Sequence, residues 1–378
     1  MKSDRRRIVQ GLGAGWLAGL VGCGRAQEQQ MTTAGQADSG SGSKTILILG
    51  GTGFVGPFVV RRALERGYTP TLFNRGRTSL EIFPDLELLT GDRNGEIGSI
   101  RAEVLAGRRW DAVVDLSGFT GPTVRDTAEL LADATEHYVF MSSVAAYESF
   151  ASANNESSPL HAWWKIWNVG YGPYKARAER EARIAMDGRV TNIRPTIIAG
   201  PEDSRDRLTY WPARVARGGE MLIPGPPDTP VQFVDVRDVA DFTIHCAEQR
   251  LAGNFNVVIP PGSYTMQQLI SDCRAVTGGQ IDATWVSPEF VDNQGIDPED
   301  SLPLWDSPLG DRRAFSLIEA PQGFANGLRT RPPLETLRDT YEWWQDQTAS
   351  RRSSLRAGIE AEAEAALLRA WHESNAAA

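Results

Sequence analysis

The stretch Ile46-Leu-Ile-Leu-Gly-Gly-Thr-Gly-Phe-Val-Gly56 decides the fold of this chain. It opens with a short apolar run rich in β-branched residues, which is typical of a buried parallel strand. Glycines follow at positions 50, 51, 53 and 56, and an apolar stripe at helical spacing runs from Phe54 to Leu64. A strand, a glycine-rich turn and a helix in this order predict a site for a dinucleotide.

The glycines of such a turn have three separate physical purposes. One permits the tight turn, one lets the backbone approach a pyrophosphate, and one lets the helix pack close to the strand. The start of the helix also offers free N–H groups and the positive end of its dipole to the phosphates. A glycine-rich turn of an unrelated α/β protein is the alternative. The cofactor-binding residues predicted here are Gly50, Gly51, Thr52, Gly53, Phe54, Val55 and Gly56.

Further strands and helices alternate along the next hundred residues. Strands that alternate with helices predict an α/β fold built on a parallel, doubly wound sheet. After the first strand, the sequence predicts strands over 69–74, 86–92, 110–118 and 137–141, and a helix over 124–134.

The end of the second predicted strand bears on the choice between NAD and NADP. An acidic residue there would bind the ribose 2′-OH of NAD. This chain has Asn74 instead, followed by Arg75 and Arg77. The missing carboxylate and the two arginines favour a 2′-phosphate and hence NADP, although solvated loop arginines are the alternative. Further cofactor-binding candidates follow the third and fourth strands: Asp92, at the expected adenine edge, with Arg93, and Leu116, Ser117 and Gly118.

A candidate catalytic group follows the fifth strand. Ser143 comes directly after it, and Tyr171 and Lys175 open an amphipathic helix. Residues at i and i+4 share one helix face. A phenol has a pKa near 10 in water, so it can act as a base at neutral pH only when its anion is stabilised. A nearby ammonium and a positive nicotinamide ring both do so, and a serine hydroxyl can hold the reacting oxygen.

With these motifs the chain resembles the extended short-chain dehydrogenase/reductase family, of the NAD-dependent epimerase/dehydratase type, over about residues 44–344. The resemblance implies that Tyr171 is the acid/base, that Lys175 anchors the nicotinamide ribose and biases Tyr171, and that Ser143 orients the reacting oxygen. It rests on Gly50-x-x-Gly53-x-x-Gly56, Asp92, Ser143, Tyr171 with Lys175, and Arg194-Pro195.

The same resemblance implies that Pro195 lines the nicotinamide pocket. It also disfavours one branch of the family. The 4,6-dehydratases carry Asp-Glu beside the active-site hydroxyl residue, where this chain has Val144-Ala145.

The N-terminal residues 1–43 are interpreted as an export signal and a flexible tether. Arg5-Arg6 precede a short, weakly apolar run that ends at Cys23, and the following residues are rich in Gly, Ser, Gln and Ala. This pattern resembles a bacterial twin-arginine signal with a lipoprotein box. It implies lipidation of Cys23 and an exported, periplasmic or extracytoplasmic membrane-anchored lipoprotein. A disordered tail on a cytoplasmic protein is the alternative.

The rest of the chain divides into three parts. Residues 44–199 are expected to form the dinucleotide-binding domain. Residues 200–350, which begin with a shift to Gly, Pro and Arg, are expected to form a smaller C-terminal substrate-binding lobe interleaved with the last sheet strands. Residues 351–378 are expected to form an appended C-terminal helix.

Composition limits the possible partners. The formal net charge of −9 argues against a nucleic-acid partner held through phosphates. The cysteines and histidines lack metal-ligand spacing, so no metal site is predicted. We therefore expect an NAD(P)-dependent oxidoreductase or epimerase acting on a hydroxyl or carbonyl centre of a sugar-like or other small molecule. A non-catalytic dinucleotide-binding sensor or regulator and an RNA-binding relative are the alternatives, and a homodimer stays open.

Overall fold

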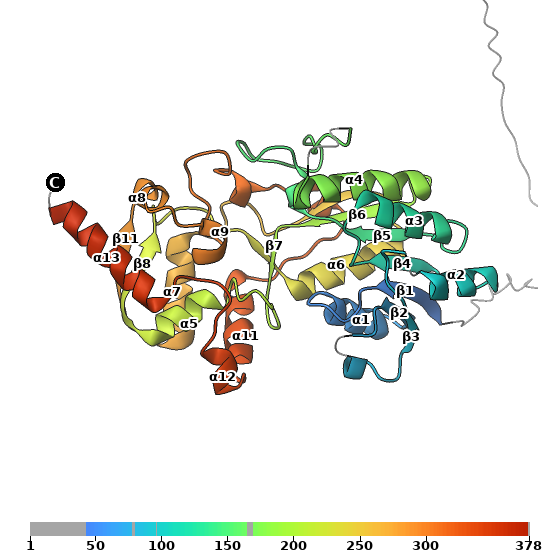
Figure 1. Cartoon of the computed structure of the whole chain (residues 1–378), viewed down its shortest axis with the longest axis horizontal. Helices are drawn as coiled ribbons and strands as arrows, with labels where there is room; N and C mark the ends of the chain where they lie inside the picture. The colour runs from blue at the N-terminus through green and yellow to red at the C-terminus, as the bar shows by residue number, and fades with distance from the viewer. Residues whose placement is uncertain (1–42, 78–79, 96, 165–168, 377–378) are drawn as a thin grey trace, which may run out of the picture. The chain divides into compact units, whose positions relative to one another are not determined.

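The computed structural model describes residues 43–77, 80–95, 97–164 and 169–376 (Figure 1). Residues from Ser43 onward form one compact unit. The predicted signal residues Arg5, Arg6 and Cys23 lie outside the described residues. Among the described residues, the structure has no helix that is both long enough and apolar enough to cross a membrane.

A seven-stranded sheet organises the first half of this unit, in the order β10-β6-β5-β4-β1-β2-β3 with all neighbours parallel. The α/β fold with a doubly wound parallel sheet is therefore confirmed. The order reverses between β1 and β4, and ligands of such folds bind beyond the carboxyl ends of the strands at this point. The strands are β1 (Lys44–Leu49), β2 (Tyr68–Asn74), β3 (Glu87–Thr90), β4 (Ala112–Asp115), β5 (Tyr138–Met141), β6 (Val190–Pro195) and β10 (Gly253–Val257).

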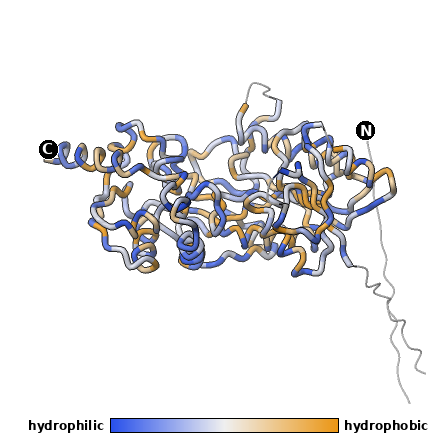
Figure 2. Tube along the Cα trace, turned by 60° about the horizontal axis from the view of Figure 1, so that its bottom comes forward, coloured by the Kyte–Doolittle hydropathy of each residue, from blue (hydrophilic) through white to orange (hydrophobic). Residues whose placement is uncertain are grey.

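Helices cover both faces of the sheet, which explains why β1 is apolar throughout rather than alternating. Ile46 and Ile48 belong to the core on the side of α1 and α6, while Leu47 and Leu49 belong to the core on the side of α2, α3 and α4. Figure 1 shows these two helix layers, and Figure 2 shows apolar positions concentrated in the strands between them. The helices are α1 (Gly56–Glu65), α6 (Val236–Gln249), α2 (Gly98–Leu105), α3 (Gly121–Leu131) and α4 (Tyr171–Ala185).

One helix begins earlier than the sequence pattern indicated, and capping explains the shift. The helix expected at 124 begins at Gly121, because the side chain of Thr120 caps its first turn and a proline follows. The helix α6 begins at Val236, since the Asp235 carboxylate accepts a bond from the Arg237 amide. Polar caps precede the apolar stripe, so a search for periodicity alone misses the first turn.

A smaller lobe lies at the other end of the unit and has its own core. Its centre is a parallel pair of strands, β8 (Gly219–Pro224) and β11 (Ile281–Val286), and a second pair, β7 (Ile197–Ala199) with β9 (Phe233–Asp235), lies between this lobe and the main sheet. The helices of this half of the chain are α5 (Tyr210–Arg217), α7 (Met266–Thr277), α8 (Pro288–Asn293), α9 (Pro298–Ser301), α10 (Pro321–Ala325), α11 (Pro333–Gln345), α12 (Ala349–Arg352) and α13 (Ala361–Ala376).

The C-terminal helix α13 packs on β8 of this lobe. Its Glu364 is only 3% exposed and lies against two arginines of α5. The carboxylate accepts bonds from Arg214 Nε at 2.7 Å and from Arg217 Nη2 at 2.9 Å. It also accepts a bond from the Leu222 amide at 3.2 Å. The appended segment is therefore joined to the lobe by a buried charge cluster.

Candidate active site

The glycine-rich turn after β1 has the three properties that the sequence indicated. Gly50 has a φ of +96°, in the region that favours glycine. A Cβ on Gly56 would lie 2.5 Å from the carbonyl carbon of Gly51, so α1 and the turn approach each other as closely as backbones can. A Cβ on Gly53 would meet no atom within 4 Å, so space beside the turn is open to a ligand.

A cleft of about 440 Å³ opens beside this turn, at the switch point of the sheet. It takes in the ends of β1, β2, β3 and β4, where a dinucleotide binds in such folds. The predicted cofactor-binding residues that line it are Gly50, Thr52, Gly53, Asn74, Arg75, Asp92, Arg93, Leu116 and Ser117.

The other predicted cofactor-binding residues are not part of this lining. Gly51, Phe54, Val55 and Gly56 support the turn, whereas Arg77 lies beyond the cleft on an exposed stretch after β2. Gly118, Lys175 and Pro195 also lie outside the lining. The sequence analysis missed further lining residues, which their position after β2, β3 and β4 could have indicated: Phe73, Gly91, Asn94, Phe119, Thr120 and Thr123.

Buried donors without a partner show what kind of ligand fits the cleft. Among the described residues, Asn74 Nδ2 and the Nε and Nη2 atoms of Arg93 are buried and have no hydrogen-bond acceptor. Unsatisfied buried donors are rare, because each forfeits its bonds to water. A dinucleotide carries ribose and phosphate oxygens that accept such bonds. The residues of the cleft therefore fit this class of cofactor.

Asp115, at the end of β4, connects the cleft to the candidate catalytic helix, and the sequence analysis did not single it out. The carboxylate is fully buried and forms an ion pair with Arg93. It accepts bonds from the Gly118 amide at 2.8 Å and from the Tyr138 hydroxyl at 2.7 Å. Burial and the charge of Asp115 raise the pKa of Tyr138 well above its usual value. An aspartate at the end of an apolar strand was the signal available in the sequence.

Lys175 lies on α4, directly behind the loop that follows β4. Its side chain is 5% exposed, and Nζ donates to the carbonyl oxygens of Gly118 and Met141, both at 2.7 Å. Burial lowers the pKa of Lys175 to about 8, against the opposing charge of Asp115. The ammonium therefore lies in an environment that weakens its hold on the proton.

Tyr171 begins α4 and reaches Ser143, which follows β5. The Ser143 hydroxyl lies near enough to the Tyr171 hydroxyl to lower the pKa of Tyr171. Ser143 Oγ also accepts a bond from the Ala145 amide at 3.1 Å, which fixes the serine. Tyr171 is 51% exposed, and the partial burial of its side chain raises its pKa. The Ser143 hydroxyl and the charges of Arg205 and Arg207 act in the opposite direction.

A buried ion pair holds α4 against the sheet beneath these residues. Glu179, one turn after Lys175, accepts bonds from Arg194 Nε at 2.8 Å and from Arg194 Nη2 at 2.6 Å. Ser142 donates to the same carboxylate at 2.5 Å. Arg194, which the resemblance singled out, therefore lies under the helix and braces it.

Family comparison agrees with this geometry. Residues 46–258 match the NAD dependent epimerase/dehydratase family, and this span is more than half of the 378 residues. The chain belongs to the NAD dependent epimerase/dehydratase family. Membership indicates an NAD-dependent, epimerase-type enzyme that binds a nicotinamide dinucleotide.

Solved structures of this family share the fold at low sequence identity. UDP-glucose 4-epimerase from Thermotoga maritima, solved with UDP-glucose, has a TM-score of 0.57 and 18% identity, covering 80% of this chain and 98% of its own. UDP-glucose 4-epimerase from Thermus thermophilus, solved with NAD, has a TM-score of 0.58 and 17% identity, covering 80% of this chain and 100% of its own. These likenesses establish the fold.

One curated relative carries a different name. The chloroplast stem-loop binding protein of 41 kDa b from Arabidopsis thaliana is 25% identical over 220 residues. The match covers 53% of this chain and 54% of the relative, so the chain spans about half the length of that protein.

Proposed function

We propose that the protein oxidises or reduces a hydroxyl or carbonyl carbon of a small molecule, with Tyr171 as the group that moves the proton. One observation carries this proposal. Tyr171 lies beside Ser143, and Lys175 lies one turn further along the same helix, behind the cleft that fits a dinucleotide.

Tyr171 is the proposed acid and base. A bound nicotinamide would supply or accept the hydride. When a carbonyl is reduced, the Tyr171 hydroxyl gives its proton to the carbonyl oxygen, and when an alcohol is oxidised, the phenolate takes the proton back. The phenol is protonated at neutral pH because its ordinary pKa is near 10, and burial raises that pKa further.

Lys175 and Ser143 assist Tyr171, Lys175 through its charge and Ser143 through its hydroxyl group. The Lys175 ammonium lies 5.8 Å from the centre of the Tyr171 ring, and a cation at this distance favours the phenolate. The bonds to Gly118 and Met141 hold the ammonium in place. Ser143 donates to the reacting oxygen and orients it. The same residues serve a reductase and an epimerase, whereas Val144-Ala145 argues against a 4,6-dehydratase.

NADP is the proposed preferred cofactor. Asn74 takes the place of the carboxylate that would bind the 2′-OH of NAD, and Arg75 lines the cleft beside it. The unpartnered donors of Asn74 and Arg93 lie in the same cleft and suit an additional phosphate. Calorimetry with NAD and NADP on the purified full chain tests this preference.

The experiment that tests the proposed function is a substrate screen. The full chain, loaded with oxidised or reduced nicotinamide cofactor, is mixed with carbonyl compounds, alcohols and nucleotide sugars, and turnover is followed by nicotinamide absorbance and by product analysis. A substrate that is turned over by the wild-type protein and not by Tyr171→Phe supports the proposal. Cofactor binding without turnover of any compound would favour the sensor.

Binding of an RNA stem-loop is the second candidate function, because the Arabidopsis relative is named for it. The net charge of −9 opposes it. Fluorescence anisotropy with an RNA hairpin at physiological salt distinguishes the two. A dissociation constant well below the range of about 10⁻⁶–10⁻⁴ M that is usual for non-specific binding would support this candidate.

A further inference from the structure

We propose that the ion pair of Arg93 and Asp115 positions the ammonium group of Lys175 and makes it respond to the bound cofactor. Asp115 holds the loop 116–118, this loop holds Lys175, and Arg93 connects the carboxylate to the cofactor cleft. The inference rests on the proposed function only for the role of Lys175 in the reaction. It assigns Arg93 and Asp115 as positioning residues.

A single residue, Gly118, joins Asp115 to Lys175. The Asp115 carboxylate accepts bonds from the amide of Ser117 at 3.1 Å and from the amide of Gly118 at 2.8 Å. The carbonyl oxygen of the same Gly118 accepts a bond from Lys175 Nζ at 2.7 Å. The carboxylate and the ammonium therefore bind the two backbone polar groups of one residue.

Close packing prevents Gly118 from moving independently of its neighbours. A Cβ on this residue would lie 2.7 Å from each of three side-chain atoms, Asp115 Oδ2, Phe140 Cε2 and Val124 Cγ2. The centre of the same Phe140 ring lies 5.0 Å from Lys175 Nζ. Because interiors packed this closely transmit small displacements, a change at Asp115 should also change the surroundings of the ammonium.

Arg93 connects Asp115 to the cofactor cleft. Its Nη1 atom pairs with the Asp115 carboxylate and donates to Ser117 Oγ at 3.3 Å. Its side chain is 8% exposed, and its Nε and Nη2 atoms are buried without an acceptor among the described residues. Since Arg93 lines the cleft, these two donors are available to an anionic group of the cofactor.

The two charges of the pair act on Lys175 in opposite directions. Burial lowers the pKa of Lys175 most, and the charge of Arg93 lowers this pKa further. The carboxylates of Asp115 and Glu179 raise it. An anionic group bound at Arg93 would offset the charge of the guanidinium. The bound cofactor should therefore raise the pKa of Lys175 and keep its ammonium charged.

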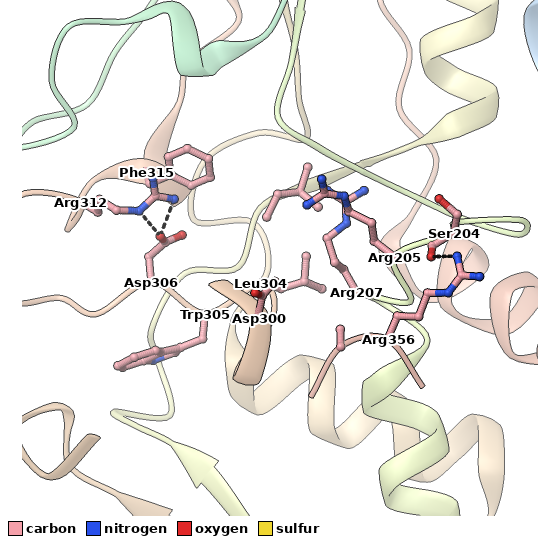
Figure 3. A pocket seen from close by; sticks show the side chains of 12 residues that line it. Ser204, Arg205, Arg207, Asp300, Leu304, Trp305, Asp306, Arg312, Phe315 and Arg356 are labelled. Carbon is pink, nitrogen blue, oxygen red and sulfur yellow. Dashed lines mark hydrogen bonds and ion pairs between the residues drawn. The ribbon is translucent and has the colours of Figure 1, made fainter. Parts of the chain in front are cut away.

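A different pair of charges acts on Tyr171. Burial raises the pKa of Tyr171, and the charges of Arg205 and Arg207 oppose this rise. Both arginines line a cavity of about 270 Å³ between the main sheet and the smaller lobe (Figure 3). The charged groups that act on Lys175 in the described structure do not include them. A variant of Arg205 is therefore the matched control for variants of Arg93 and Asp115.

NMR titration of the lysine side chains tests the inference without a substrate. The full chain is labelled with ¹³C at lysine Cε, whose chemical shift follows the protonation of the ammonium. The signal of interest is the one that Lys175→Met removes. Few other signals can overlap with it, because the sequence has only four lysines: Lys2, Lys44, Lys165 and Lys175.

Asp115→Asn removes the charge and keeps the shape of the side chain. The pKa of Lys175 should fall from about 8 to about 7 or lower, since a close opposite charge usually shifts a pKa by about 1–3. Arg93→Gln should instead raise this pKa above about 8, and Arg205→Gln should leave it at the wild-type value. If Arg93 and Asp115 only supported the fold, either replacement would expose Lys175 to water. Both variants would then raise the pKa toward its ordinary value of 10.5.

Nucleotides without a nicotinamide ring test whether Arg93 transmits the effect of the cofactor. ADP and adenosine 2′,5′-bisphosphate represent the adenine sides of NAD and NADP, and neither places a positive ring beside Lys175. At concentrations that calorimetry shows to be saturating, at least one of them should raise the pKa of Lys175 in the wild-type protein and not in Arg93→Gln. If Asp115→Asn does not fold, this comparison still decides, because it leaves the carboxylate in place.

Three results would each overturn the inference. They are shifts in the same direction in Asp115→Asn and Arg93→Gln, a pKa of Lys175 in both variants equal to that in Arg205→Gln, and no effect of either nucleotide on the wild-type protein. The proposed function fails separately, because normal turnover by Tyr171→Phe refutes it whatever the pKa of Lys175. Conversely, Tyr171→Phe can abolish turnover while Lys175 titrates independently of Arg93 and Asp115.

Discussion

The Lys175 ammonium lies 5.8 Å from the centre of the Tyr171 ring, one turn away on the same helix. The Tyr171 hydroxyl lies at the other end of that ring, near Ser143. The two ends of the Tyr171 ring therefore have different neighbours, a cation over the ring and a hydroxyl group near the phenol oxygen. This division of roles leads to the first prediction.

Replacing Tyr171 with Phe should collapse turnover by about two to four powers of ten, because a positioned acid/base contributes an effect of that size. The melting temperature and the cofactor affinity should stay nearly unchanged, since the ring and its packing remain. Ser143→Ala should cost less, because water can partly replace its hydroxyl. Steady-state kinetics alongside calorimetry would check this, and wild-type turnover by the Phe variant would refute the assignment.

The depressed pKa of Lys175 predicts a pH dependence of stability. Its pKa is about 8 in the folded chain, against an ordinary value of 10.5. Between these pH values the unfolded chain keeps the Lys175 proton and the folded chain does not, so the contribution of Lys175 to the free energy of unfolding, measured as the difference from Lys175→Met, should rise as the pH rises through this window. This difference should reach up to about 3 kcal/mol at the upper end of the window. Denaturant titrations at several pH values measure it, with exposed Lys44→Met as the control whose pH dependence should follow that of the wild-type protein.

Substitutions of two glycines of the turn should affect different properties, the stability of the fold for Gly56 and the cofactor affinity for Gly53. Gly56→Ala places a Cβ 2.5 Å from the Gly51 carbonyl carbon, so the free energy of unfolding should fall by about 1–3 kcal/mol, as in overpacked cores. Gly53→Ala meets no atom within 4 Å, so stability should change by less than about 0.5 kcal/mol. Cofactor affinity should nevertheless fall, because the new methyl group occupies the space beside the turn. Equal loss of stability in both variants would contradict these roles.

The NADP preference should depend on Arg75 rather than on Arg77. Of these two arginines, only Arg75 lines the cleft. Arg75→Ala should therefore weaken the binding of NADP by about ten- to a hundredfold and the binding of NAD much less. Arg77→Ala is the matched control, and it should keep the preference. Replacing both arginines should erase it. Equal affinities of the wild-type protein for NAD and NADP, measured by calorimetry, would end the NADP proposal.

Export remains a prediction from the sequence. Replacing Arg5 and Arg6 with Lys should retain the protein in the bacterial cytoplasm, and Cys23→Ala should release it from the membrane fraction. Cell fractionation and immunoblotting measure both effects. Unchanged fractionation of both variants would show that these residues are not an export signal.

Local patterns predicted the parts of this protein that depend on neighbours in the sequence. The turn after Leu49 and the Tyr171–Lys175 pair could be identified because each is a short motif with its own physical cause. Asp115, at the end of β4, forms an ion pair with Arg93, which follows β3. No spacing in the sequence predicts that contact.

The same reason explains why the cavity between the two lobes could not be identified from the sequence. The cavity of Arg205 and Arg207 also takes in Arg312 and Arg356, from distant parts of the chain. Arg77, close in sequence to Asn74, does not line the cleft, so its contact with the cofactor stays a prediction.

The buried carboxylate of Glu364 has a consequence for the order of synthesis. Its partner Arg214 precedes it by 150 residues. A ribosome that adds about 5–20 residues each second needs roughly 8–30 s to cover that distance. During this interval the α5 arginines lack their counter-ion and part of the apolar face of the lobe is uncovered. The nascent lobe is therefore the part of the protein that we expect a chaperone to recognise.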